Sequence, residues 1–250
     1  LGEGEDYWVA QRVSRGVEPV GGDIHDTSEP TVVIECTPLP FKARAHYFRD
    51  GMEVVVPSTR RTAPDSLTPR AKTHNYMNLM IAHEEVRRQN TNAWAILLDV
   101  NGNLCEGVGS NIFIVEDGVI YTPEDRYVLC GVSRQTAIDL AEAAGLKVVR
   151  KDLDLYDAYT ADESFLSSSP YCVLPVARID KRDLEGDVPG PITERLLAAW
   201  SEEVGLDIVG HYSNRLGEAR NRFVVLTLLC VRHAHSKMIL RHLLRGHFRV

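Results

Sequence analysis

Hydrophobic positions along the chain follow two periods, one typical of strands and one typical of helices. Short apolar runs, several of them alternating with polar positions, predict β-strands. They lie at residues 7–13, 31–36, 53–56, 93–100, 111–116, 119–121, 147–150, 163–167 and 172–178. Segments that combine an apolar stripe with a charged face predict helices, at residues 73–89, 133–144 and 192–204, with a short helix around residues 156–161. Because strands and helices are mixed without a regular βαβ alternation, we expect an α+β fold.

Two dipeptides between neighbouring apolar runs indicate how those runs are joined. Asn101-Gly102 follows the run at residues 93–100, and Asp117-Gly118 precedes the run at residues 119–121. Both dipeptides tolerate the positive φ angles that tight hairpins need. Two successive β-hairpins are therefore predicted in this part of the chain.

The chain divides by composition into four parts. The β-rich residues 1–62 predict a partial small α+β domain, and the Pro-, Ser- and Thr-rich residues 63–70 predict a connector. Residues 71–213 hold most of the other expected helices and strands and predict a larger domain. Residues 214–250 are basic and rich in histidine. They do not match the acidic body, so we expect an atypical tail.

Composition excludes several classes of protein. The 250 residues are 44% hydrophobic and 25% charged, as in a soluble globular protein. A net charge of -7 argues against a nucleic-acid partner. The longest apolar run, residues 223–231, is far shorter than the ~20 residues that a bilayer requires, and the N-terminus does not have the pattern of a signal peptide. The five cysteines are an odd number without a CxxC pair, so we expect no disulfide framework, no metal site and a reducing cytoplasm.

Lys72 and Glu106 are the first candidates for chemistry. Lys72 stands where the connector enters the expected helix at residues 73–89, and a partly desolvated lysine there would be a nucleophile. A solvated lysine at a helix start is the ordinary alternative. Glu106 lies between two apolar strands and would need a cationic partner such as a protonated pyridine nitrogen. A turn glutamate beside a hairpin explains it equally well.

Hydroxyl-bearing residues supply two candidate anion sites. Gly131-Val132-Ser133 opens a helix, whose free N–H groups and dipole would hold a phosphate, although Ser133 would also serve as an ordinary N-cap. The serine turn at residues 167–169 would donate to a phosphate or a carboxylate, although a plain loop is the ordinary reading of such a feature by itself. Tyr76 would reach a cofactor hydroxyl, or pack in the core on the apolar stripe of its helix.

The order of these pieces resembles the class IV (fold type IV) pyridoxal-phosphate enzymes. This group includes branched-chain aminotransferases, D-amino-acid aminotransferases, (R)-selective amine transaminases and aminodeoxychorismate lyase. The matching stretches are residues 58–61, 69–76, 97–113, 131–134 and 165–169, and the similarity covers roughly residues 6–212. The resemblance implies a two-lobed fold, with a small N-terminal lobe, incomplete here, and a larger pseudo-barrel-like lobe, residues 71–213, that binds the cofactor.

The resemblance also implies a role for each matched residue. Lys72 would form the Schiff base with pyridoxal 5'-phosphate and shuttle a proton, and Glu106 would pair with the pyridine nitrogen. The phosphate or the substrate carboxylate would be held by residues at the helix start and the serine turn, namely Val132, Ser133, Ser168 and Ser169. Tyr76 would approach the phenolic oxygen of the cofactor.

The implied function is amino transfer between an amino acid or amine and a 2-oxo acid, of the branched-chain or D-amino-acid type, in a cytoplasmic homodimer. A lyase of the aminodeoxychorismate type is the alternative. Family members also carry a phosphate-binding arginine upstream of the strand at residues 7–13, where this chain has almost no residues. A truncated, catalytically impaired homologue is therefore a further alternative.

Overall fold

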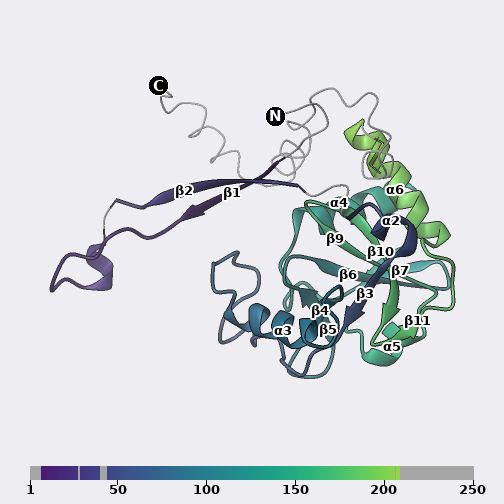
Figure 1. Ribbon diagram of the computed structural model, residues 1–250, viewed down its shortest axis with the longest axis horizontal. Helices are drawn as coiled ribbons and strands as arrows, with labels where there is room; N and C mark the ends of the chain where they lie inside the picture. Colours follow the sequence, from purple (N-terminus) through teal and green to yellow (C-terminus); the bar gives the residue numbers. More distant parts are fainter. Residues whose placement is uncertain (1–6, 28, 40–43, 206, 209–250) are drawn as a thin grey trace.

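A computed structural model describes residues 7–27, 29–39, 44–205 and 207–208 of the chain (Figure 1). The tail expected at residues 214–250 lies outside the described residues. The described part consists of a body built on one large sheet and a separate two-stranded ribbon.

Nine strands form the sheet of the body. They are β3 (Met52–Val55), β4 (Trp94–Leu98), β5 (Leu104–Gly107), β6 (Asn111–Glu116), β7 (Val119–Thr122), β8 (Val148–Arg150), β9 (Glu163–Ser168), β10 (Cys172–Ile179) and β11 (Arg182–Asp183). Their order is β11-β10-β3-β4-β5-β6-β7-β8, and β9 pairs with both β10 and β6. The strands β10, β3, β4, β5, β6 and β9 therefore close into a ring, and this ring removes most of the open sheet edge.

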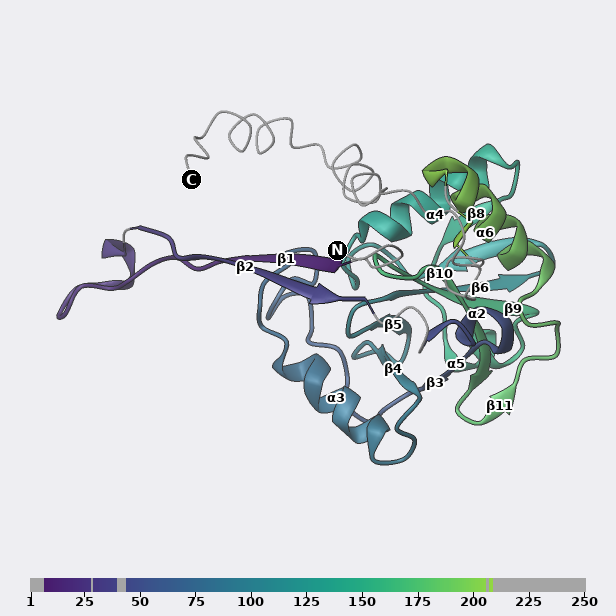
Figure 2. The same cartoon turned by 45° about the horizontal axis from the view of Figure 1, so that its top comes forward.

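Helices cover this ring on different sides (Figure 2). Helices α4 (Val132–Ala143) and α6 (Pro191–Val204) pack on each other and on β9 and β10, whereas α3 (Met77–Arg87) packs on β4. The short helices are η1 (Ile24–Asp26), α2 (Tyr47–Asp50) and α5 (Leu155–Tyr159). Among the described helices, none combines the length and the apolar character needed to span a bilayer.

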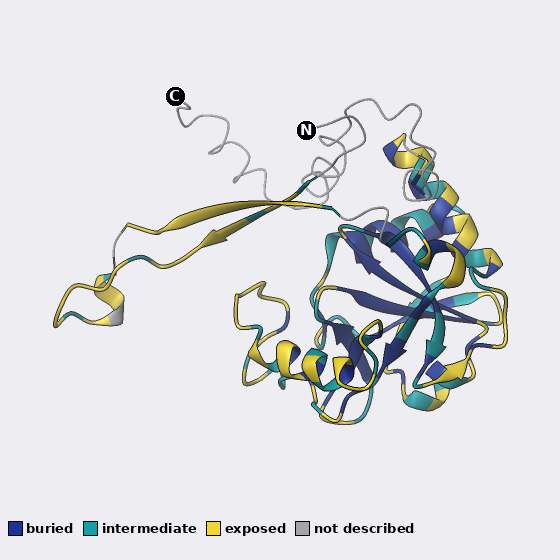
Figure 3. Cartoon of the chain, viewed as in Figure 1, coloured by how far each residue is buried: buried dark blue, intermediate teal, exposed yellow. Residues whose placement is uncertain are grey.

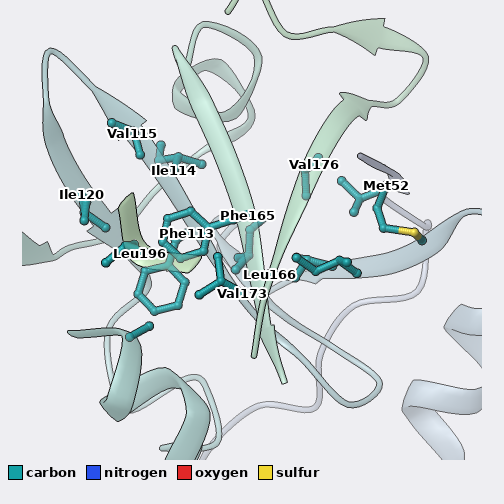
Figure 4. Close-up of a cluster of buried hydrophobic side chains, with 14 of the residues drawn as sticks. Met52, Phe113, Ile114, Val115, Ile120, Phe165, Leu166, Val173, Val176 and Leu196 are labelled. Atoms are coloured by element: carbon teal, nitrogen blue, oxygen red, sulfur yellow. The ribbon is translucent and has the colours of Figure 1, made fainter. Parts of the chain in front are cut away.

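The main core fills the space between the sheet and helices α4 and α6. Phe113 of β6 and Phe165 of β9 are cross-strand partners whose rings stack with centroids 4.7 Å apart (Figure 4). A second, smaller core lies between α3 and β4. Alternate residues of β4 serve the two cores, because Ile96 joins the main cluster while Ala95 and Leu97 join the smaller one. This explains why the strand reads as a continuous apolar run.

Both expected hairpins are present. Strands β4 and β5 pair antiparallel across the turn that holds Gly102, and β6 and β7 pair antiparallel across Asp117-Gly118. Asp117 has φ 49° and Gly118 has φ 74°, as a two-residue hairpin turn demands. Local turn chemistry thus determines this part of the sheet.

The helix expected at residues 73–89 begins later than the pattern indicates. Helix α3 starts at Met77, because the Tyr76 N–H donates to the carbonyl oxygen of His74 in a short turn, which helical geometry does not allow. The first helical bond runs from the Met80 N–H to the Tyr76 carbonyl. Lys72 therefore lies in an irregular segment ahead of the helix.

Strands β1 (Tyr7–Val13) and β2 (Val32–Pro38) form an antiparallel ribbon that extends from the body in both views (Figures 1 and 2). Its residues are mostly exposed (Figure 3). Strand β3, which lies inside the small domain expected at residues 1–62, is part of the main sheet. The division of the chain into domains stays a prediction.

Candidate functional site

A row of polar side chains crosses one end of the sheet. Glu106 of β5 pairs with Asn111 of β6, and Asn111 pairs in turn with Ser167 of β9. Directly opposed residues of neighbouring strands project to the same face of a sheet. All three residues are buried. The row therefore concentrates polar groups in an otherwise apolar interior.

The Glu106 carboxylate accepts a hydrogen bond on each oxygen. The Arg61 Nε donates to Oε1 over 2.9 Å, and the Leu129 N–H donates to Oε2 over 2.8 Å. The Arg61 and Glu106 side chains are only 10% and 6% exposed. Burial raises the pKa of Glu106 above its usual range, opposed by the Leu129 hydrogen bond and by the charges of Arg61 and Lys72. Glu106 is therefore a buried carboxylate supported by two cations.

Arg61 reaches Glu106 because its backbone is fixed on both sides. The Arg61 N–H donates to the Leu98 carbonyl of β4 over 2.8 Å. The Asn78 side chain of α3 accepts from the Thr62 N–H and donates to the Arg60 carbonyl, over 3.2 and 2.6 Å. The segment carrying Arg61 is thus held between β4 and α3.

Glu85 adds a second clamp from α3 to the same segment. Its carboxylate accepts from the Ser58 N–H over 2.6 Å and from the N–H and hydroxyl of Thr59 over 3.2 and 3.0 Å. Partial burial alone would raise the pKa of Glu85, but these hydrogen bonds outweigh it and hold the pKa below its usual range. The entry to the Lys72 segment is therefore rigidly attached to the body.

Lys72 and Tyr76 occupy the irregular segment ahead of α3. The Lys72 side chain is exposed, and its charge acts on the Glu106 carboxylate. Tyr76 is half-buried at the N-cap of α3 and packs against the smaller core. This packing is the ordinary alternative that the sequence left open for Tyr76.

The start of α4 has free N–H donors. Gly131 is the N-cap, and no side chain caps the helix. Val132 and Ser133 are the first two helical residues, and Ser133 is buried. Ordinary capping by Ser133 is therefore excluded, and the positive end of the helix dipole is left without a side-chain acceptor.

The loop that leads into α4 is tied to the polar row. The Asn111 amide donates to the Leu129 carbonyl over 3.0 Å, and the Leu129 N–H binds Glu106. A Cβ added at Gly131 would overlap the Asn111 side-chain oxygen. Leu129 is thus hydrogen-bonded to both Glu106 and Asn111, and these bonds bring the start of α4 beside the two side chains.

The serine turn lies at the end of β9, next to the same row. Ser168 ends β9 and is buried, whereas Ser169 is exposed. The Ser167 hydroxyl is buried and has no hydrogen-bond partner in the part of the chain that the structure describes. Buried hydroxyls without a partner are rare in folded proteins, so this hydroxyl indicates a site for a further polar group.

The structure thus groups Glu106, the start of α4 and the end of β9, with Lys72 near enough for its charge to act on Glu106. Sequence reasoning gave no role to Arg61 or Asn111. Arg61 stood inside a matched motif, but nothing in the sequence indicates which carboxylate it meets. Asn111 also stood inside a matched motif, but nothing in the sequence indicates that its side chain meets the Leu129 carbonyl.

Comparison with known proteins identifies the family of this chain. The model of the family described as amino-transferase class IV matches residues 7–179. A putative branched-chain-amino-acid aminotransferase of Methanocaldococcus jannaschii is 35% identical over 192 residues, covering 76% of this chain and 65% of that protein. The chain spans between about half and two thirds of the length of the first such relatives, from 51% to 65%.

Solved structures give the same result for the fold. The branched-chain amino acid aminotransferase of Escherichia coli matches with a TM-score of 0.72 at 29% identity, over 86% of this chain and 70% of that one. A second branched-chain amino acid aminotransferase, solved with pyridoxamine 5'-phosphate, matches with a TM-score of 0.69 at 28% identity, over 78% and 64% of the two chains. The expected type IV fold is confirmed, and this chain belongs to the class IV aminotransferase family.

Proposed function

We propose that the chain is the cofactor-binding part of a pyridoxal-phosphate-dependent aminotransferase, which moves an amino group between an amino acid and a 2-oxo acid. One observation carries the proposal: a buried, ionically supported Glu106 carboxylate lies beside an uncapped helix start, with Lys72 close enough for its charge to act on Glu106. These groups suit a ring nitrogen, a phosphate and an aldehyde carbon respectively.

The donor set fits the cofactor at both of its ends. Each Glu106 oxygen accepts one hydrogen bond here and keeps a free lone pair, so the carboxylate can accept a third donor from a pyridine ring. The first N–H groups of α4, with the Val132 and Ser133 positions, would hold the phosphate. Ser168 and Ser169 would complete that cradle or bind the substrate carboxylate. The unpartnered Ser167 hydroxyl supports a polar occupant at this place.

When bound, pyridoxal 5'-phosphate supplies an electron sink next to the carbon that loses its proton. The Glu106 carboxylate would keep the ring nitrogen protonated, which maintains that sink. Lys72 would attach the cofactor through its Nζ and, once displaced by the amine of a substrate, would carry the proton as general acid and base. Tyr76, whose ring packs against the smaller core, would donate to the phenolic oxygen.

We infer a branched-chain substrate, because the relatives named above are branched-chain aminotransferases. Amino transfer to D-amino acids and an aminodeoxychorismate lyase activity would use the same lysine and are outcomes of the test. We also propose a homodimer, since apolar side chains are exposed on α3, among them Met77, Met80 and Ile81. A cytoplasmic location fits the free cysteines of the described residues, Cys36, Cys105, Cys130 and Cys172.

The test is the visible absorbance of the full chain after addition of pyridoxal 5'-phosphate. We expect a band that Lys72→Ala abolishes and that the exposed control Lys147→Ala leaves unchanged. A band that survives Lys72→Ala unchanged would show that the lysine is wrongly assigned. Absence of any band in the unaltered chain would refute the proposed function.

Product analysis then identifies the reaction. L-Leucine with 2-oxoglutarate, D-alanine with 2-oxoglutarate, and aminodeoxychorismate alone are offered to the same preparation. Formation of glutamate from leucine supports the branched-chain reading. Transfer from D-alanine alone, or release of pyruvate from aminodeoxychorismate, would overturn it in favour of one of the alternatives.

A further inference from the structure

The buried ion pair of Arg61 and Glu106 joins two parts of the chain that are far apart in sequence. We propose that Arg61 is a positioning residue that fixes the orientation of the Glu106 carboxylate and keeps it ionised. The inference rests on the proposed function, in which Glu106 holds the ring nitrogen of the cofactor. Arg61 itself touches neither substrate nor cofactor in this scheme.

Geometry supports the orienting role. The Arg61 Nε and the Leu129 N–H each bind a different oxygen of Glu106, over 2.9 and 2.8 Å, so the plane of the carboxylate is set from two sides. Both donors are themselves fixed. The Arg61 N–H is bonded to Leu98, and the Leu129 carbonyl accepts from the Asn111 amide. A carboxylate held in this way needs no reorganisation to receive a third donor.

Charge supports the second role. A buried carboxylate without a cation takes up a proton, because burial penalises the charged form. The cations whose charges lower the pKa of Glu106 are Arg61, from the connector side, and Lys72, from the segment before α3. The neighbouring Cys105 on β5 is neutral, since burial raises the pKa of its thiol. Lys72 is exposed, so the buried guanidinium of Arg61 is the more effective partner.

The consequence for the cofactor is direct. An ionised Glu106 attracts a protonated ring nitrogen, whereas a protonated Glu106 is neutral and offers no such attraction. Removal of Arg61 should therefore weaken the hold on the ring and shift the ring nitrogen toward its unprotonated form. A guanidinium that only fills space would have neither effect.

The test compares five variants of the full chain: Arg61→Met, Arg61→Lys, Glu106→Gln, the double variant that combines Arg61→Met with Glu106→Gln, and the exposed control Arg60→Met. The first measurement is the melting temperature without added cofactor, between about pH 5 and pH 9, a range that extends above the ordinary pKa of a glutamate. Where Glu106 is protonated, it carries no charge and needs no cation. As pH rises through its raised folded-state pKa, the group must ionise, and the Arg61 charge then stabilises it.

Arg61→Met should have a lower melting temperature than the unaltered chain, and we expect this deficit to widen with rising pH. Arg61→Lys should recover part of the deficit, and Arg60→Met should show none. When Glu106→Gln is added to Arg61→Met, the pH dependence of the deficit should vanish, because no carboxylate is left to ionise. A deficit that is the same at every pH, or that persists unchanged in the double variant, would assign Arg61 a packing role and overturn the proposal.

The second measurement is the affinity for pyridoxal 5'-phosphate. We expect Arg61→Met to weaken it by about tenfold or more, the loss that removal of a partner supporting a metal ligand causes in metal sites. If the unaltered chain binds no cofactor, the proposed function fails while the melting experiment still decides the role of Arg61. If Arg61→Met does not fold, the double variant should fold. A double variant that also fails to fold would count against the proposal.

Discussion

Replacement of Glu163 by glutamine tests how the start of α6 is stabilised. Glu163 is a buried residue of β9, and its carboxylate accepts from the Ile192 N–H over 2.9 Å and from the N–H and hydroxyl of Thr193 over 2.8 and 2.7 Å. Hydrogen bonds to a charged acceptor contribute about 1.5–3 kcal/mol each. Glutamine keeps one acceptor oxygen and loses the charge, so we expect a loss of about 2–3 kcal/mol in the free energy of unfolding.

The measurement is thermal and urea unfolding followed by circular dichroism. For a domain of this size, that loss corresponds to a fall in melting temperature of about 4–12 °C. Glu194→Gln is the matched control, because Glu194 lies in the first turn of the same helix but is exposed. A fall for Glu163→Gln no larger than the control value would show that the carboxylate does not stabilise α6 as its hydrogen bonds indicate.

Two further predictions concern the start of α4 and the dependence of stability on pH in the alkaline range. Gly131→Ala places a methyl group against the Asn111 side chain, so we expect a loss of about 1–3 kcal/mol in the free energy of unfolding measured with urea. Gly109→Ala is the control, because a methyl group there meets open space. Equal losses in the two variants would contradict the argument. Burial, with the hydrogen bond that its hydroxyl donates to Asp180, raises the pKa of Tyr159 to about 12. The stability that this shift supplies is complete below the unfolded-state pKa of the tyrosine and is lost as pH rises toward 12. Tyr159→Phe should therefore reduce the fall in the free energy of unfolding over that range. A fall of the same size in Tyr159→Phe would count against this reasoning.

Local patterns predicted much of the fold. The hairpin turns at residues 101–102 and 117–118, and the strands that they join, depend on dihedral preferences that a dipeptide carries by itself. The helix at residues 133–144 was predicted from its apolar stripe and charged face, and α4 begins one residue earlier, at Val132. The family came from the order of several motifs and is confirmed by the family match, whereas the roles of Lys72 and Glu106 stay predictions.

Other features depended on contacts between distant segments. The start of α3 at Met77 follows from a turn at His74 that the apolar stripe does not reveal. The sheet closes because β9 pairs with β6 and β10, and no local pattern specifies those partners. The family predicted a barrel-like lobe, but the register of its strands is set by packing of the whole core.

Lys72 and Glu106 show most clearly what could be predicted from the sequence and what required the tertiary structure. The sequence by itself made both residues candidates, and the family resemblance implied the chemistry that they would carry. Only the tertiary structure placed Arg61 and the Leu129 N–H on the two oxygens of Glu106. The physical reason is that residue type determines which bonds a side chain can make, whereas the energy of a buried charge depends on neighbours that only folding brings near.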